Sequence, residues 1–228
     1  MSAPAAAWRI AVPGEDVAVR AVLEPATGAP LEALFVCAHG AGGDMDHREL
    51  VATSTALRGV GFDVVRFNFA DPMPRLMRCV AAVAAHARDA ARPRRLVLGG
   101  RSMGGRAASM LLAEQALAAD ALLALAYPLH PARAPEKPRD AHLARIQVPV
   151  LSVNGTRDAL CDRALMTRAV SGLPNWTIHW LEAADHGFDL PKRSGRTKED
   201  VMAEVAAAAR DWVVAAVRAG RATASHRL

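Results

Sequence analysis

One serine lies between two glycines, at the point where an apolar run changes into a helical pattern. Residues 100–104, Gly-Arg-Ser-Met-Gly, fit the pattern G-x-S-x-G and follow the strand-like segment 95–99. In this position the pattern is typical of a nucleophile elbow, a tight turn that holds a serine hydroxyl clear of a sheet. Glycine at both flanks, Gly100 and Gly104, avoids collisions with the neighbouring strand and helix. The spacing therefore predicts Ser102 as a nucleophile.

A serine hydroxyl needs a base that removes its proton and an acid that orients the base. In proteins with this elbow, the acid and the histidine follow the serine in that order. His186 follows the last strand-like segment and precedes the last helical one, and Asp158 lies just beyond the segment VLSVN. Asp162 is the near alternative for the acid, and Asp185, which adjoins the histidine in the chain, is a weaker one. The other histidines beyond Ser102 lie in a strand-like segment, a proline-rich loop or the C-terminal tail: His179, His130, His142 and His226.

Acyl transfer through a serine also needs two backbone N–H groups that stabilise the tetrahedral oxyanion. The residue after the nucleophile, Met103, supplies one of them in this kind of elbow. The glycine-rich segment 39–43 should supply the other, with Ala41 as first choice and Gly42 as second. We expect His39 to brace this segment through hydrogen bonds rather than to take part in chemistry.

Two further groups of polar residues lie beside these segments. Asp44, Asp46 and His47 could hold a metal ion, but no second ligand cluster accompanies them. We therefore expect one of the two acids to cap the following helix, and we predict neither a metal nor a cofactor. Arg101 and Arg106 flank the serine and could clamp an anionic substrate or pair with a nearby acid.

Short β-rich segments alternate with helical patterns along the chain, which predicts strands joined by right-handed helical crossovers. We expect strands at 8–12, 17–23, 34–38, 62–69, 95–99, 121–127, 148–155 and 176–183, and helices at 47–58, 75–90, 104–118, 162–172 and 198–219. The first two strands flank the turn PGED and should pair antiparallel, and Thr197 is a candidate cap for the last helix. The predicted fold is a single three-layer α/β domain, residues 1–228, with a mostly parallel sheet of about eight strands. The candidate site residues then meet at the carboxyl edge of the sheet.

Composition argues against several other classes of protein. The net charge is +5, but the arginines are scattered and only ten residues are aromatic, which disfavours a nucleic-acid partner. No apolar stretch approaches the roughly 20 residues of a membrane span, and the N-terminal residues make a poor signal peptide. Cys37, Cys79 and Cys161 fit neither a disulfide framework nor a zinc pattern. We expect a cytoplasmic protein with buried thiols, no membrane partner and an oligomeric state that its sequence leaves open.

The chain resembles an α/β-hydrolase over about residues 10–219. It is similar, more narrowly, to the small capless dienelactone-hydrolase-like proteins, including bacterial members related to the hydrolase-like subunit of the animal NSL chromatin complex. The segments that carry the resemblance are CAHGAGGDMDH, GGRSMGGRAAS, YPLHP, VNGTRDALCD and ADHGFDLPKRSGRT. The resemblance implies the triad Ser102, Asp158 and His186. Dienelactone hydrolases have cysteine where this chain has Ser102, so their lactone substrate is not carried over.

The segment between the strands 121–127 and 148–155 is too short for the helical cap domain that many such hydrolases insert there. An uncapped site should be shallow and open, which suits small soluble esters or thioesters. Met45 and His130 are candidates for the rim of the pocket. The sequence thus predicts a serine hydrolase of the carboxylesterase type. The alternatives are a binding or interaction module that has kept the fold without turnover, and a thioesterase or peptidase that uses the same residues.

Overall fold

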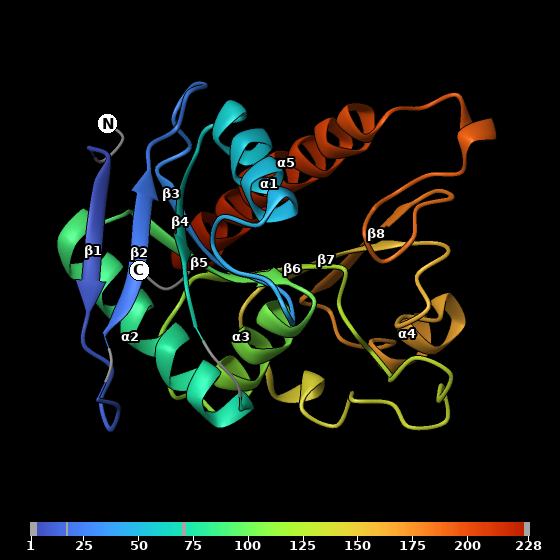
Figure 1. Ribbon diagram of the computed structural model, residues 1–228, viewed down its shortest axis with the longest axis horizontal. Coiled ribbons are helices and arrows are strands. Elements are labelled where there is room, and N and C mark those ends of the chain that lie inside the picture. The colour runs from blue at the N-terminus through green and yellow to red at the C-terminus, as the bar shows by residue number, and fades with distance from the viewer. Residues whose placement is uncertain (1–3, 17, 70–71, 226–228) are drawn as a thin grey trace.

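The computed structural model describes residues 4–16, 18–69 and 72–225, and in the last helix it describes side chains as far as residue 216. In this part of the chain eight strands form one sheet in the order β1-β2-β4-β3-β5-β6-β7-β8 (Figure 1). β1 and β2 are antiparallel, β2 is antiparallel to β4, and all other neighbours are parallel. The strands are β1 (Ala6–Ile10), β2 (Val19–Glu24), β3 (Ala33–Ala38), β4 (Phe62–Phe67), β5 (Arg95–Arg101), β6 (Ala121–Leu125), β7 (Val150–Gly155) and β8 (Trp176–Leu181).

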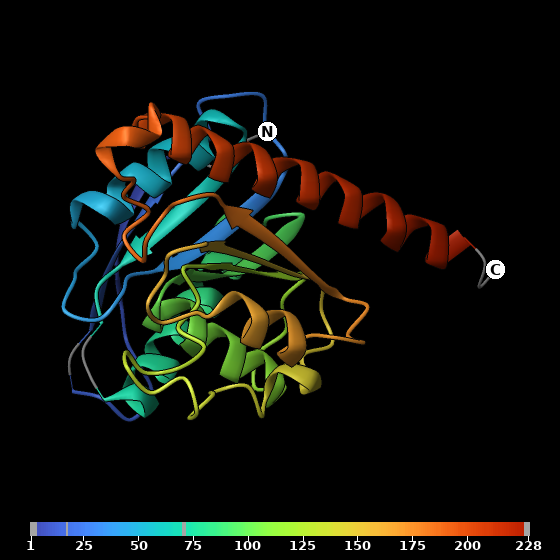
Figure 2. The same ribbon diagram turned by 90° about the vertical axis from the view of Figure 1, so that its right-hand side faces the viewer.

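Helices cover both faces of the sheet, because its central strands are apolar on both sides (Figures 1 and 2). α1 (Arg48–Gly59) and α5 (Lys198–Ser225) lie on one face, and the C-terminal part of α5 extends past the sheet (Figure 2). α2 (Met73–Ala91), α3 (Met103–Ala113) and α4 (Arg163–Ala169) lie on the other. The two faces carry two separate aliphatic cores. The predicted three-layer α/β fold is thereby confirmed.

Three local expectations have different outcomes. The helix predicted at 104–118 ends at Ala113, because Gln115 takes a left-handed conformation (φ 54°) and the N–H of Ala116 bonds back to the carbonyl of Leu111. The capping role of Thr197 is confirmed, since its hydroxyl accepts the N–H of Asp200 at 3.1 Å. The predicted start of the second strand, residue 17, lies outside the described residues.

The connection between β6 and β7 holds no cap domain. Its one regular element is a short 3₁₀ turn, Leu143–Arg145, and the rest is loop. The carboxyl edge of the sheet is therefore left uncovered by any inserted helical domain, as the short segment predicts.

Candidate active site

Ser102 lies on a strained turn between β5 and α3. Its backbone has φ 48° and ψ −115°, a conformation that costs a non-glycine residue about 1–3 kcal/mol. Its N–H donates to the carbonyl of Leu125 on the neighbouring strand at 2.8 Å, which helps to hold the turn in place. A Cβ on Gly100 would lie 2.1 Å from the carbonyl oxygen of Ala38, and one on Gly104 would lie 2.6 Å from the same oxygen. The flanking glycines let the turn approach β3 this closely.

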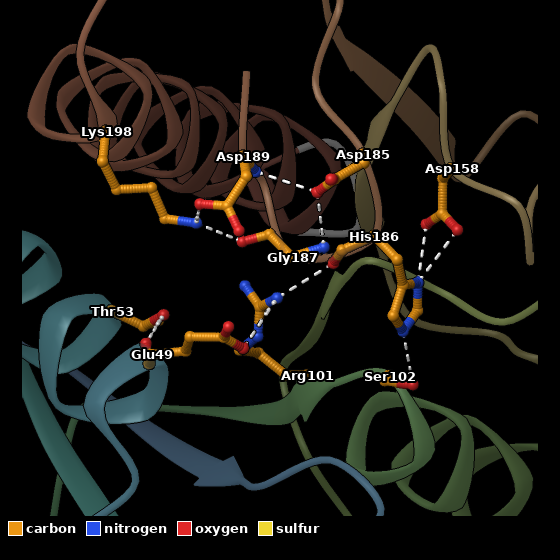
Figure 3. Close-up of polar contacts among 10 residues, drawn as sticks. All are labelled: Glu49, Thr53, Arg101, Ser102, Asp158, Asp185, His186, Gly187, Asp189 and Lys198. Carbon is orange, nitrogen blue, oxygen red and sulfur yellow. Dashed lines mark hydrogen bonds and ion pairs between the residues drawn. The ribbon is translucent and has the colours of Figure 1, made fainter. Parts of the chain in front are cut away.

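A chain of hydrogen bonds runs from Ser102 through His186 to Asp158 (Figure 3). His186 Nε2 lies 2.9 Å from Ser102 Oγ, and His186 Nδ1 lies 2.9 and 2.8 Å from the two carboxylate oxygens of Asp158. An ionised carboxylate only accepts hydrogen bonds, so Nδ1 carries the ring proton and Nε2 is left to accept the serine proton. The Asp158 side chain is 0% exposed, and it also accepts the N–H of Leu160 at 2.8 Å.

The two other acids considered for this role lie in different contacts. Asp162 caps α4, since its Oδ1 accepts the N–H of Leu165 at 2.8 Å. Asp185 folds back on its own turn and accepts the N–H groups of Gly187 and Asp189, each at 2.9 Å. The structure therefore brings only Asp158, of the three candidates, to the ring of His186.

A cavity of about 420 Å³ opens beside Ser102. The loop after β3 forms one wall, with Ala41 and Gly42, and the first turn of α1 forms another, with Glu49 and Leu50. His39 also lines the cavity. Its ring stacks on Phe69 with a centroid distance of 3.6 Å, and its Nδ1 lies 2.8 Å from the carbonyl oxygen of Gly40. These two contacts hold the loop beside the site. Met103 directly follows Ser102 as the first residue of α3, and its side chain packs against the core.

Met45 and His130 do not line this cavity. Met45 is buried, with its N–H donating to Asn68 Oδ1 at 2.8 Å and its carbonyl accepting from Arg66. His130 is also buried and accepts the N–H of Asp162 at 2.9 Å. Both residues are buried, Met45 with its backbone and His130 with its ring bonded to other segments, so neither lies at the rim.

Arg101 lies in the cavity wall but is already paired. Its guanidinium donates to the carbonyl of His186 at 3.0 Å, lies 3.5 Å from Glu49 Oε2 and stacks 4.6 Å from the ring centroid of Phe188. Burial lowers the pKa of Arg101, and the nearby Glu49 opposes that shift. Of the two roles considered for Arg101, the structure therefore shows pairing with an acid. Arg106 lies instead beside the hollow between α2 and α3.

The expectation that Asp44 or Asp46 caps α1 is wrong. His47 occupies the cap position and makes no side-chain capping bond. Asp44 Oδ1 instead accepts the N–H of Asp46 at 2.8 Å, and Asp46 pairs with Arg66 at 3.4 Å. These local contacts use both carboxylates before the helix begins. Among the described residues, no three His, Cys, Asp or Glu side chains lie close enough together to hold a metal ion.

A second serine–histidine contact lies inside the protein. Ser109 Oγ is 2.8 Å from His142 Nε2, with Tyr127 Oη 3.3 Å from the same nitrogen. Ser109 is fully buried on α3, and its hydroxyl also lies 2.6 Å from the carbonyl oxygen of Arg106, so it cannot meet a substrate. Burial lowers the pKa of His142 to about 4, which keeps this histidine neutral. The contact attaches the β6–β7 loop to α3.

Sequence reasoning missed Glu49, Phe188 and Lys198, which hold the residues around the serine and histidine. No motif surrounds Glu49 or Lys198, since each lies in the first turn of an ordinary helix. The three cysteines are free and buried, as expected. In the described part of the chain, none of the helices has both the length and the apolar character of a membrane span.

A sheet in this strand order, with a strained serine after the fifth strand and a histidine after the last, defines a class of α/β proteins. Residues 31–214 match the family model described as an alpha/beta hydrolase domain, so the chain belongs to that family.

Solved structures of low sequence identity share the fold. An α/β serine hydrolase without lid from Xanthomonas campestris is 21% identical, with a TM-score of 0.72 over 93% of this chain and 96% of that one. Est1E from Butyrivibrio proteoclasticus is 16% identical, with a TM-score of 0.71 over 91% and 99%. A dienelactone hydrolase from Anabaena variabilis is 18% identical, with a TM-score of 0.66 over 92% and 97%.

Proposed function

We propose that the protein is a serine hydrolase that cleaves small carboxylic esters or thioesters through an acyl-enzyme intermediate. The observation that carries the proposal is the chain of hydrogen bonds from Ser102 Oγ through His186 to the buried carboxylate of Asp158. A strained, glycine-flanked serine at a helix start costs stability, and such strain persists where a function depends on it.

In the proposed reaction Ser102 Oγ attacks the carbonyl carbon while His186 Nε2 takes the hydroxyl proton. Asp158 keeps the ring in the required orientation and stabilises the imidazolium. The backbone N–H of Met103 and that of Ala41, or alternatively Gly42, would stabilise the oxyanion. The imidazolium then donates its proton to the leaving oxygen or sulfur as the bond to the carbonyl carbon breaks. A water molecule, deprotonated by the same ring, then attacks the acyl carbon. The bond to Ser102 Oγ breaks, the imidazolium returns the proton to Oγ, and the acid is released.

The size and openness of the cavity support small substrates. About 420 Å³ is at the lower end of the range of small-molecule sites, and no cap domain covers it. Acyl chains beyond about eight carbons would extend past the walls into water and gain little from binding. We therefore expect kcat/KM to be highest for short acyl groups, and a preference for long chains would contradict this part of the proposal.

Covalent labelling with a fluorophosphonate tests the proposal directly, because only an activated serine reacts with it. We expect the wild-type protein to be labelled, and Ser102→Ala and His186→Ala to lose labelling. Ser109→Ala serves as the matched control and should keep it. Labelling that persists in Ser102→Ala would place the nucleophile elsewhere. A folded wild-type protein that is neither labelled nor active on any short activated ester or thioester would favour a binding module.

The narrower relationship, to the bacterial proteins similar to the hydrolase-like subunit of the NSL complex, remains part of the proposal. It is supported by the site segments, which include GRSMGG and ADHGFD. We also propose that the protein is cytoplasmic and acts on a small molecule. The proposal includes no nucleic-acid partner, no membrane partner and no cofactor.

A further inference from the structure

We infer that Arg101 is a positioning residue that couples the nucleophile to its base, by holding the His186 loop at a fixed distance from the Ser102 turn. The inference rests on the proposed function, since positioning matters for rate only where His186 activates Ser102. Figure 3 shows Arg101 between the histidine loop and Glu49.

The position of Arg101 in the chain is the first argument. It is the last residue of β5 and directly precedes Ser102, so its backbone moves with the nucleophile turn. Its guanidinium donates to the backbone carbonyl of His186 at 3.0 Å, a residue 85 positions away. One side chain therefore joins the two halves of the site by a covalent link on one side and a hydrogen bond on the other.

The surroundings of the guanidinium fix its orientation. The Arg101 side chain is only 6% exposed, and it lies between the ring of Phe188 at 4.6 Å and Glu49 Oε2 at 3.5 Å. A planar guanidinium can stack on a ring and donate from its edge at the same time, which a lysine ammonium cannot do. Since Phe188 belongs to the same loop as His186, two contacts from Arg101 hold that loop.

A second set of contacts holds the loop from its other side, without reaching the nucleophile. Lys198 on α5 donates to the carbonyl of Gly187 and pairs with Asp189 at 2.8 Å. These bonds attach the loop to α5. The start of the loop is also bonded to the turn after β7, where the N–H of Arg157 donates to the carbonyl of Ala184 at 2.9 Å. Beside the hydrogen bond between His186 and Ser102 itself, Arg101 joins the loop to the strand that carries the nucleophile.

Arg101→Ala tests the inference, with Arg58→Ala as a matched control. Arg58 also donates to a backbone carbonyl, that of Pro25 at 2.8 Å, and lies 3.5 Å from a glutamate, Glu24, but it is at the far end of α1. A displacement of about 1 Å in an active site can cost about 10²-fold in rate. We expect kcat on a short ester to fall by about 10²-fold in Arg101→Ala with little change in KM, and to stay near wild type in Arg58→Ala.

Rescue separates positioning from general damage to the fold. Guanidinium ion, at concentrations that leave the wild type folded and active, should enter the space left in Arg101→Ala and restore at least part of kcat. It should do nothing for the wild type or for Arg58→Ala. A folded Arg101→Ala with wild-type kcat, or a loss of kcat that guanidinium does not reverse, would overturn the inference. If Arg101→Ala does not fold, Arg101→Lys decides, with reduced kcat at an unchanged melting temperature in support and wild-type kcat against.

A measurement that does not depend on turnover distinguishes failure of this inference from failure of the proposed function. His186 Nδ1 lies 2.9 and 2.8 Å from the carboxylate oxygens of Asp158, so in the wild type its proton should give a downfield NMR resonance that reports how the His186 ring is held. We expect the signal to broaden or disappear in Arg101→Ala and to return with guanidinium, whether or not the wild type hydrolyses esters. An unchanged signal in Arg101→Ala would overturn the inference by itself.

Discussion

Alanine at position 104 tests how closely the nucleophile turn is fitted to the sheet. Gly104 lies in the first turn of α3 and has an ordinary helical backbone, so alanine introduces no backbone strain there. Its Cβ would lie 2.6 Å from each of three atoms, namely the Cβ and carbonyl oxygen of Ala38 and the carbonyl oxygen of His39. Two of these are backbone atoms, one in the last residue of β3 and one in the residue after it, and they cannot rotate away, so α3 itself must move.

The expected size of the effect follows from two opposing contributions. Alanine is favoured over glycine within a helix by about 1 kcal/mol. An inserted methyl group in a tightly packed site costs about 1–3 kcal/mol, and contact with fixed backbone atoms favours the upper end of that range. The net loss for Gly104→Ala is then about 2 kcal/mol, which lowers the melting temperature of a domain of this size by about 4–8 °C. Carbon atoms pack at about 3.5–4.0 Å, so relief of the clash needs a shift of about 1 Å, which moves Ser102 and should lower kcat/KM by about 10²-fold.

Gly59→Ala is the matched control, because Gly59 is also helical and a Cβ there would have no heavy atom within 4 Å. This substitution should leave activity unchanged and raise the melting temperature by about 2–4 °C, corresponding to a gain of up to about 1 kcal/mol. Thermal unfolding followed by circular dichroism, together with hydrolysis of a short activated ester, gives both numbers. If Gly104→Ala matches Gly59→Ala in stability and keeps full activity, the close fit of the turn against β3 is refuted.

Three further substitutions test other parts of the structure. Gly100→Val should fold poorly and lose activity, because Gly100 has φ 143° and a Cβ there would lie 2.1 Å from the carbonyl oxygen of Ala38; a soluble, active variant in an expression and activity assay would contradict this. Thr197→Ala removes the hydroxyl that caps α5 at the N–H of Asp200, and it should lower the free energy of unfolding by urea by about 1 kcal/mol. An unchanged free energy of unfolding would contradict the cap. His142 has its pKa lowered from 6.5 to about 4, so between these pH values the unfolded chain binds more protons than the folded protein, and stability falls as the pH falls. The contribution of His142 to the slope of the unfolding free energy against pH is at most about 1.4 kcal/mol per pH unit. Urea unfolding at several pH values should show that His142→Gln lacks this contribution, and equal slopes in the two proteins would contradict the prediction.

The fold was predictable because its signals are local and repeat along the chain. Segments such as LFVCA and LVLG are short and apolar throughout, as strands covered on both faces must be. Element ends were less predictable. The end of α3 at Ala113 depends on the left-handed Gln115, and nothing in an otherwise helical pattern marks that residue.

The residues brought together at the site were predictable for a different reason. In a parallel sheet the loops after the strands share one edge, so Ser102, Asp158 and His186 were each marked by position as well as residue type. Met45 and His130 also follow strands, but no required chemical role marked them, and both are buried in other contacts. Position after a strand was therefore informative only together with a residue type that the chemistry requires.

The two serine–histidine contacts show what the sequence could not separate. Ser109 and His142 lie as close together as Ser102 and His186, at 2.8 and 2.9 Å. The difference lies in what surrounds each pair. His186 has a carboxylate on its far nitrogen and opens onto the cavity, whereas the inner pair is closed off by α3 and faces a tyrosine. Ser109 is fully buried, and its hydroxyl also lies 2.6 Å from the carbonyl oxygen of Arg106. Of the two pairs, the outer one combines a base oriented by a carboxylate with access for a substrate, which is why we propose it, and not the inner one, as the catalytic pair.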